Sequence, residues 1–253
     1  MTVIASSLRR LLMLVAFLLA GPALAALTDE VSLDRSWSTA SRDSAGIGPD
    51  PATTPEAVVQ VYGARTFGWR GAFAVHTWIA VKPEGAGSFT TYEVIGWRYW
   101  HGGNGLVRRQ GPPDRRWFGS TPEIYTDLRG AEAAATIPQI EAAVAGYRFA
   151  QTYQTWPGPN SNTFTASVAR QVPALALDLP PTAIGKDYLG PADFLAETPS
   201  GTGYQVSLFG LFGGALAVEE GLEVTLLGLT FGIDPLDLAI KLPGLGRLSA
   251  ISR

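Results

Sequence analysis

The chain has 253 residues, of which 46% are hydrophobic and 16% charged, with no cysteine and two histidines. Its net charge is −3 and its Lys and Arg residues form no cluster. Nucleic acid is therefore not an expected partner, because phosphate binding needs concentrated positive charge. The missing cysteines exclude disulfides, a cysteine nucleophile and thiolate metal ligands, and two histidines are too few for a multi-histidine zinc site. We expect no metal and no cofactor.

The N-terminus predicts export from the cytoplasm. Arg9 and Arg10 precede an apolar run over residues 11–20, and Ala23-Leu24-Ala25 supplies a small-x-small end. This pattern favours a secretory signal peptide over residues 1–25, cleaved after Ala25. The alternative is an N-terminal anchor, for which the apolar run is barely long enough. In both cases the remainder lies outside the cytoplasm, either periplasmic or anchored in the inner membrane facing the periplasm.

The next segments predict a polar lead-in over residues 26–56 and a single domain over residues 57–253. In the domain, residues 58–62, 73–81 and 90–100 are rich in β-branched and aromatic residues, which is typical of strands. A turn around Pro83-Glu84-Gly85 predicts a hairpin between the second and third of these strands.

Two helices are expected in the middle of the chain, over residues 131–147 and 162–172. In the second, Phe164, Val168 and Val172 share one face at four-residue steps. From residue 204 onward, apolar runs interrupted by glycine predict a β-rich half, with a membrane-apposed hairpin as the alternative, since the runs are short for membrane spans. The expected fold class is α+β, an antiparallel β-sheet with a few packed helices.

The stretch Trp156-Pro-Gly-Pro-Asn-Ser-Asn-Thr-Phe164 stands directly before the second helix. Asn160, Ser161 and Asn162 are all good helix N-cap residues, and capping contributes about 1 kcal/mol. A serine at a helix start also lies near unpaired N–H groups and the positive end of the macrodipole, which suits a nucleophile. Capping and catalysis by Ser161 both stay open.

A catalytic serine needs a general base, and His76 is the natural candidate. Glu93, on the neighbouring predicted strand, is the candidate that would orient the imidazole ring, provided the strand register places it there. The alternative for His76 is a buried histidine with a structural hydrogen bond. If the centre binds a ligand, we expect Asn160, Asn162, Trp78 and Trp156 to contact it.

The mature chain resembles a bacterial family called "domain of unknown function 3750" over roughly residues 36 to 248. The matching motifs are Gly68-Trp-Arg-Gly71, Ala74-Val-His-Thr-Trp78, Trp156 to Phe164, Ala183-Ile-Gly-Lys-Asp187 and Lys241-Leu-Pro-Gly244. Membership of this family implies little about activity.

A more distant likeness is to the circularly permuted papain-like hydrolases, which include NlpC/P60-like peptidases and lecithin:retinol-acyltransferase-like enzymes. Their motif is Asn-Cys-x-x-Phe at a helix start, with a histidine earlier in the chain, and Asn160-Ser-Asn-Thr-Phe164 fits it with serine in place of cysteine. The resemblance implies a permuted papain-like fold. It also implies that Ser161 and His76 are the catalytic pair, with Glu93 or a backbone group left to orient the ring.

Two functions follow as expectations. The first is a cell-envelope Ser/His hydrolase or acyltransferase that acts on amide or ester bonds in peptidoglycan peptides or lipids. A hydroxyl is far less ionised than a thiol at neutral pH, so the serine weakens this case. The second is a catalytically inactive papain-like fold that acts as an envelope ligand-binding or membrane-associated module.

Overall fold

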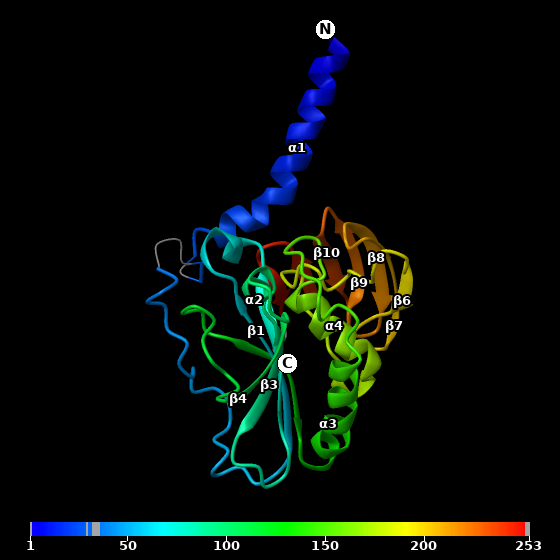
Figure 1. Ribbon diagram of the computed structural model, residues 1–253. Helices are drawn as coiled ribbons and strands as arrows, with labels where there is room; N and C mark the ends of the chain where they lie inside the picture. The colour runs from blue at the N-terminus through cyan, green and yellow to red at the C-terminus, as the bar shows by residue number, and fades with distance from the viewer. Residues whose placement is uncertain (1, 29, 32–35, 251–253) are drawn as a thin grey trace.

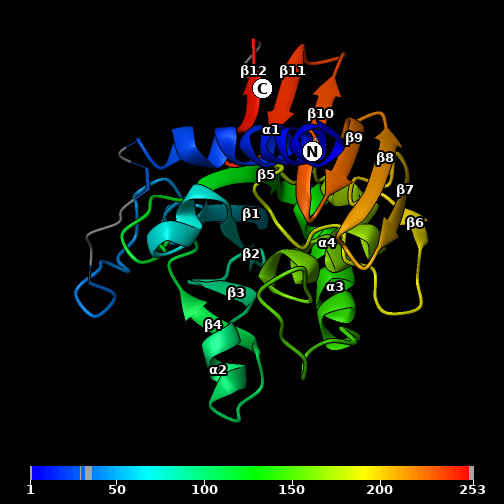
Figure 2. The same cartoon turned by 90° about the horizontal axis from the view of Figure 1, so that it is seen from above.

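The computed structural model describes residues 2–28, 30–31 and 36–250. These residues form a long N-terminal helix, a five-stranded sheet and a seven-stranded sheet. The two longer helices of the domain, α3 (Gly130–Ala145) and α4 (Ser161–Gln171), lie between the two sheets (Figure 1, Figure 2). The predicted α+β class is confirmed.

The five-stranded sheet, called the first sheet below, has the strand order β4-β3-β2-β1-β5 and is antiparallel throughout. Its strands are β1 (Val58–Arg65), β2 (Val75–Lys82), β3 (Phe89–Val94), β4 (Leu106–Gly111) and β5 (Glu123–Arg129). The three predicted strands correspond to β1, β2 and β3, which are the central strands. The predicted hairpin is formed by β2 and β3.

The prediction of a strand through residue 100 is wrong for its second half. β3 ends at Val94, and residues Gly96–Trp100 form a short helix, α2. Gly96 allows this exit from the sheet, because a Cβ there would lie 2.3 Å from the ring of Tyr153. The aromatic composition of this segment favours a strand, whereas the structure packs Gly96 against the Tyr153 ring and begins a helix there.

Both faces of the first sheet are covered. On one face, Val61 of β1 and Ile79 of β2 pack into the main core with Phe164 of α4. We call this the helix face. On the opposite face, the side chains of Tyr62 and Trp78 stack with ring centroids 5.5 Å apart. The two central strands therefore carry buried side chains at odd and even positions alike.

The lead-in covers this second face, which we call the strap face. The carboxylate of Asp114 accepts hydrogen bonds from Ser44 Oγ at 2.7 Å, from Ile47 N at 2.8 Å and from Gly48 N at 3.0 Å. Asp114 therefore fastens this segment to the domain, whereas Trp37 of the same segment is 65% exposed. Residues 29 and 32–35 of the lead-in lie outside the described residues.

The seven-stranded sheet, called the second sheet, is a meander in which each strand pairs with the next in the sequence. Its strands are β6 (Leu195–Glu197), β7 (Gly203–Leu208), β8 (Phe212–Ala217), β9 (Gly221–Leu226), β10 (Leu229–Asp234), β11 (Ala239–Leu242) and β12 (Gly246–Ser249). The predicted β-rich C-terminal half is thus observed.

The second sheet has its polar side chains inside and its apolar side chains outside. In β7, Gln205 and Ser207 are buried, whereas Tyr204, Val206 and Leu208 are exposed. The strand register continues this alternation to β12, and in these described strands no charged side chain occupies an outward position. We call the outward positions of β7 to β12 the outer face.

A network of buried charges joins the inner face of the second sheet to the rest of the domain. Glu223 of β9 pairs with both Lys186 and Lys241, the latter at 2.8 Å, and Lys241 also pairs with Asp178 at 2.6 Å. Lys186 and Lys241 are 3% and 0% exposed. These ion pairs explain the inverted orientation, because buried charges must be partnered and their partners lie only on the inner side.

The N-terminal helix α1 (Thr2–Ala25) extends from one end of the domain (Figure 1). Among the described residues, its segment Ser6–Ala25 is the one helix long and apolar enough to cross a membrane. Only its last turns are packed. Ala25 is 1% exposed and lies in a small core with Ala72, beside the 3₁₀ helix η1 (Gly68–Ala72).

Candidate functional site

His76 and Glu93 are brought together on the strap face of the first sheet. Their side chains project from β2 and β3, and His76 Nε2 lies 3.0 Å from Glu93 Oε2. His76 is 5% exposed and Glu93 is fully buried. The observed strand register therefore places Glu93 beside His76, as the hypothesis of an orienting carboxylate needed.

Arg115 completes the cluster from the loop that follows β4. Its guanidinium pairs with Glu93 Oε1, and the ring of Trp117 stacks on the His76 imidazole with centroids 3.6 Å apart. The guanidinium carbon also lies 5.3 Å from the centre of the Trp117 ring, within range of a cation–π interaction. The result is a closed cluster of three ionisable groups under an aromatic cover, called the His76 cluster below.

Burial lowers the pKa of His76, and the hydrogen bond with Glu93 opposes this effect without reversing it. The histidine is therefore neutral at pH 7 and donates its Nε2 proton to the carboxylate. Burial alone would raise the pKa of Glu93, but the bond from His76 and the charge of Arg115 outweigh it and lower that pKa. The cluster thus holds one ionised carboxylate, one neutral imidazole and the guanidinium of Arg115, and the partly exposed guanidinium of Arg109 lies 3.9 Å from Glu93 Oε1 at its edge.

Ser161 lies in the first turn of α4, in a segment held by many side-chain hydrogen bonds. Asn160 is the N-cap, and its side chain accepts bonds from the backbone N–H groups of Asn162 and Thr163. Thr163 Oγ1 accepts from Asn160 N at 3.1 Å, which completes a capping box. Capping is confirmed as one role of this stretch.

The first turn of α4 is joined to β2 through Thr77. Thr77 Oγ1 lies 3.0 Å from Asn162 Oδ1, 2.9 Å from Thr165 Oγ1 and 3.3 Å from the carbonyl oxygen of Ser161. Asn162 Nδ2 in turn donates to the carbonyl oxygen of Val75 at 3.0 Å. These contacts place α4 on the helix face of the first sheet.

The structure does not bring Ser161 and His76 together. Successive side chains of a strand point to opposite faces, so Thr77 meets α4 while His76 points away from it. His76 binds Glu93 and stacks on Trp117 on the strap face. Within the described residues, no hydrogen bond joins the Ser161 hydroxyl to the His76 ring, and the sheet itself separates them.

The four expected ligand contacts have different environments. Asn160 and Asn162 are 5% and 3% exposed. Their side-chain amide groups donate hydrogen bonds to backbone carbonyl oxygens, including that of Ile184. Trp78 is fully buried and donates from Nε1 to the carbonyl of Pro113 at 2.7 Å. Trp156 alone among them is exposed, and its indole N–H donates to Leu227 O at 3.1 Å, in the turn between β9 and β10.

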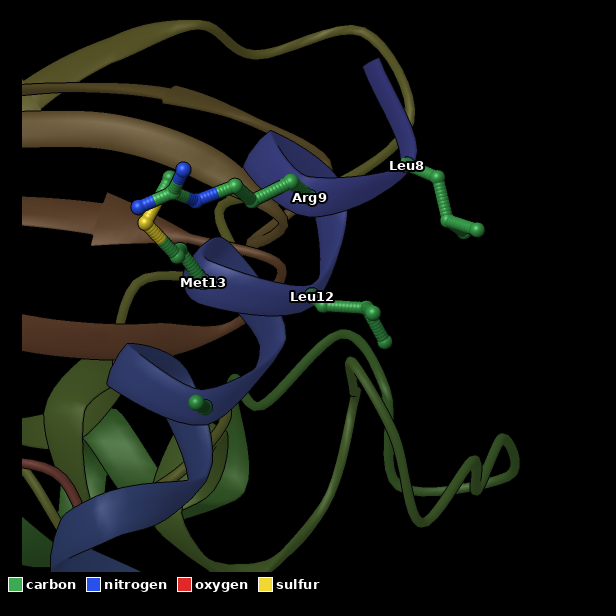
Figure 3. Close-up of a pocket in the computed structure, with 5 residues that line it drawn as sticks. Leu8, Arg9, Leu12 and Met13 are labelled. Atoms are coloured by element: carbon green, nitrogen blue, oxygen red, sulfur yellow. The ribbon is translucent and has the colours of Figure 1, made fainter. Parts of the chain in front are cut away.

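Surface hollows lie away from these residues. One is a shallow depression along α1, beside Leu8, Arg9, Leu12 and Met13 (Figure 3). Another lies beside α4 and is lined by residues such as Arg148, Arg170 and Tyr188. Neither contains His76 or Ser161. Among the described residues, no three His, Cys, Asp or Glu side chains converge as metal ligands.

Thr77 and Arg115 were not expected as functional neighbours. Thr77 is in phase with Val75 and Ile79, so the alternation of β2 was the signal that it meets a helix. Arg115 comes from an irregular loop, where no periodicity indicates which way its side chain points.

These features define a class: an α+β protein with two antiparallel sheets, two helices between them and an apolar N-terminal helix. The chain belongs to the family described as "Protein of unknown function (DUF3750)", whose model matches residues 56–188, more than half of the chain. The match covers the first sheet, α3, α4 and the loop that contains Lys186. No curated protein matches the chain. No solved structure matches it either, so the likeness to papain-like hydrolases stays a prediction.

Proposed function

We propose that this protein is a catalytically inactive module of the cell envelope, held at the membrane by α1. One observation carries the first part of the proposal: β2 presents Thr77, not His76, to the helix that begins at Ser161. A threonine hydroxyl cannot act as a general base at neutral pH, and a serine without a base is a poor nucleophile.

The environment of Ser161 also favours this proposal. Ser161 is 5% exposed, and the residues on either side of it hold β2 and the loop around Ile184 in place. The hydrogen bonds that would position a nucleophile therefore serve here to hold a helix, a strand and a loop together.

The His76 cluster favours a structural role as well. A general base must be able to accept a proton from a group that reaches it. The Nε2 proton of His76 is donated to Glu93, so Nδ1 would be the basic nitrogen, but the residue is only 5% exposed and its ring is covered by Trp117. Its burial and lowered pKa fit a neutral histidine that stabilises the carboxylate of Glu93.

The membrane part of the proposal is supported by the packing at the end of α1. Pro22 is buried against Gly244, and Ala25 is buried against Ala72, so the end of the helix belongs to the fold. A cleavage after Ala25 would cut inside this packed region. We therefore favour a retained anchor, with Arg9 and Arg10 on the cytoplasmic side and the domain on the other.

A fluorophosphonate probe tests the catalytic part. The purified full-length protein in mild detergent is incubated with the probe beside an active serine hydrolase, and labelled peptides are identified by mass spectrometry. We expect no label on Ser161 and identical labelling of the wild type and Ser161→Ala. A covalent adduct on Ser161 would refute the proposal.

The anchor is tested separately. Membranes from expressing cells are washed with alkaline carbonate, and the intact mass of the protein in the pellet is measured. We expect the protein in the pellet with residues 1–25 still attached. A soluble product that begins at Ala26 would contradict the retained anchor and leave the catalytic question untouched.

A further inference from the structure

We propose that the outer face of the second sheet contacts lipid, so that the domain is embedded at the membrane surface and not only tethered to it. The inference deepens the proposed function and rests on its claim that α1 is a membrane anchor. It assigns a surface and a partner: the outward positions of β7 to β12, and a phospholipid bilayer.

The outer face is an extended apolar surface. Leu216 is 70% exposed, Val206 56% and Ile233 50%, and these residues come from three different strands of one sheet. The pairing of Val206 with Gly214 and of Gly214 with Val224 makes the surface continuous across β7, β8 and β9. Soluble monomers rarely expose contiguous apolar patches of more than a few hundred Å². Such a surface therefore requires a cover.

Contact between the sheet and α1 indicates which cover. The ring of Phe17 in α1 stacks on the ring of Phe231 in β10, with centroids 4.9 Å apart and an angle of 10° between the planes. Phe231 occupies an outward position, because it pairs with Val224 while its neighbour Thr230 faces inward. Phe17 lies inside the Ser6–Ala25 segment that would cross the membrane. If Phe17 is in the bilayer, then Phe231 lies at the same depth.

Residues at the α1 end of the molecule fit the same placement. The β9–β10 turn, which precedes Phe231, exposes Leu227, and the exposed indole of Trp156 is bonded to that turn. Trp69 lies in η1, which contacts α1, and is 67% exposed. Tryptophan is enriched at the boundary between hydrocarbon and water, where an apolar ring and an N–H donor are both accommodated.

Side chains of α1 extend the apolar surface beyond the domain. Leu8 and Leu12 point away from the sheets into open space, and both are more than half exposed (Figure 3). Through Phe17, the helix and the outer face form one apolar surface. A second copy of the chain could cover the sheet alone, but only a bilayer also covers the isolated helix.

Site-directed spin labelling distinguishes the possible covers. The chain has no cysteine, so Val224→Cys provides a unique attachment point on the outer face. The labelled full-length protein is reconstituted into phosphatidylethanolamine–phosphatidylglycerol vesicles, and collisions of the nitroxide with oxygen and with a water-soluble nickel chelate are measured. In lipid, we expect high oxygen accessibility and a nickel accessibility several-fold lower than at Gly87→Cys. Gly87 is an exposed control in the β2–β3 turn, where an added Cβ would meet no atom within 4 Å.

Two results would overturn the inference: free access of nickel to Val224→Cys, which means water, or protection from both reagents, which means a protein cover such as a second copy. A label at Leu12→Cys reports on the anchor independently. Lipid at Leu12 with water at Val224 refutes this inference alone, whereas water at Leu12 refutes the anchor. Circular dichroism of each variant confirms that the label has not unfolded the protein.

Discussion

The two sheets of this protein differ in which side chains they bury and which they expose. The first sheet buries apolar side chains on both faces and keeps a charged cluster, built on His76, in its interior. The second sheet, over β7 to β12, turns its charges inward and exposes its apolar side chains. In the His76 cluster and in the network around Glu223, the buried charges are paired. The difference is the basis for our proposal that the outer face of the second sheet contacts lipid.

The largest expected effect comes from the inner face of the second sheet. Glu223→Gln would leave Lys186 and Lys241 without their shared carboxylate in a buried site, and we expect a loss of about 3–5 kcal/mol of unfolding free energy. Urea unfolding of the full-length protein in mild detergent measures it. Glu84→Gln, in the exposed β2–β3 turn, is the matched control and should leave stability unchanged. A Glu223→Gln protein as stable as the wild type would show that the charges do not hold this sheet in place.

The next effect compares isoleucines in the two sheets. Ile79 of β2 is fully buried in the main core, and Ile79→Ala should cost about 2–5 kcal/mol through lost burial and a cavity. Ile233 of β10 is 50% exposed, so Ile233→Ala should cost far less in detergent. Instead, Ile233→Ala should weaken retention of the protein by vesicles. Equal destabilisation by both variants would remove the distinction between the sheets.

A smaller effect is expected where α4 begins. Asn160→Ala removes the side-chain acceptor for two backbone N–H groups and should destabilise the protein by about 0.5–2 kcal/mol. Ser161→Ala removes a hydroxyl for which we propose no catalytic role, and thermal unfolding should place it close to the wild type. If Ser161→Ala were the more harmful substitution, this account of the turn would be wrong.

The smallest effect is a pH dependence. The pKa of His76 in the folded protein lies below its ordinary value of 6.5. As the pH falls below 6.5, the unfolded chain therefore binds a proton at His76 before the folded chain does. The contribution of His76 to stability is therefore present above pH 6.5 and is lost as the pH falls below it. The lowered pKa of Glu93 acts in the same direction at lower pH.

His76→Gln removes this titration, so the unfolding free energy of the variant should fall less between about pH 7.5 and pH 5.5 than that of the wild type. Urea titrations at several pH values measure the difference in slope. Parallel curves for the two proteins would mean that His76 is not buried in its neutral form.

Much of the fold could be predicted from the sequence because its elements carry local signals. β-branched and aromatic runs indicated β1, β2 and β3, and four-residue steps indicated α4. The pairing of His76 with Glu93 was also predictable, since adjacent strands were expected to carry both residues. Arg115 was not, because it reaches Glu93 from a loop whose path depends on contacts made by the whole fold.

The face of the sheet that each side chain occupies was harder to predict than the pairing of the strands. In β2, Trp78 and Ala80 are as apolar as Ile79 and Val81, so the sequence does not show which set meets the helices. In the second sheet, alternation marks the strands, but the ordinary rule would turn the apolar positions inward. The reverse arises because Glu223 must reach Lys186, 37 residues away in the sequence. Such long-range pairing has no local signal.

The central claim, that the two sheets face different surroundings, can be tested in a single sample. The full-length protein with ¹³C-labelled valine methyl groups is reconstituted in nanodiscs that contain a paramagnetic lipid, and methyl NMR spectra are recorded. We predict strong attenuation of the Val206 and Val224 signals of the second sheet and little change for Val59 and Val61 of the first. Unattenuated Val206 and Val224 signals in a sample whose α1 methyl signals are attenuated would contradict the account.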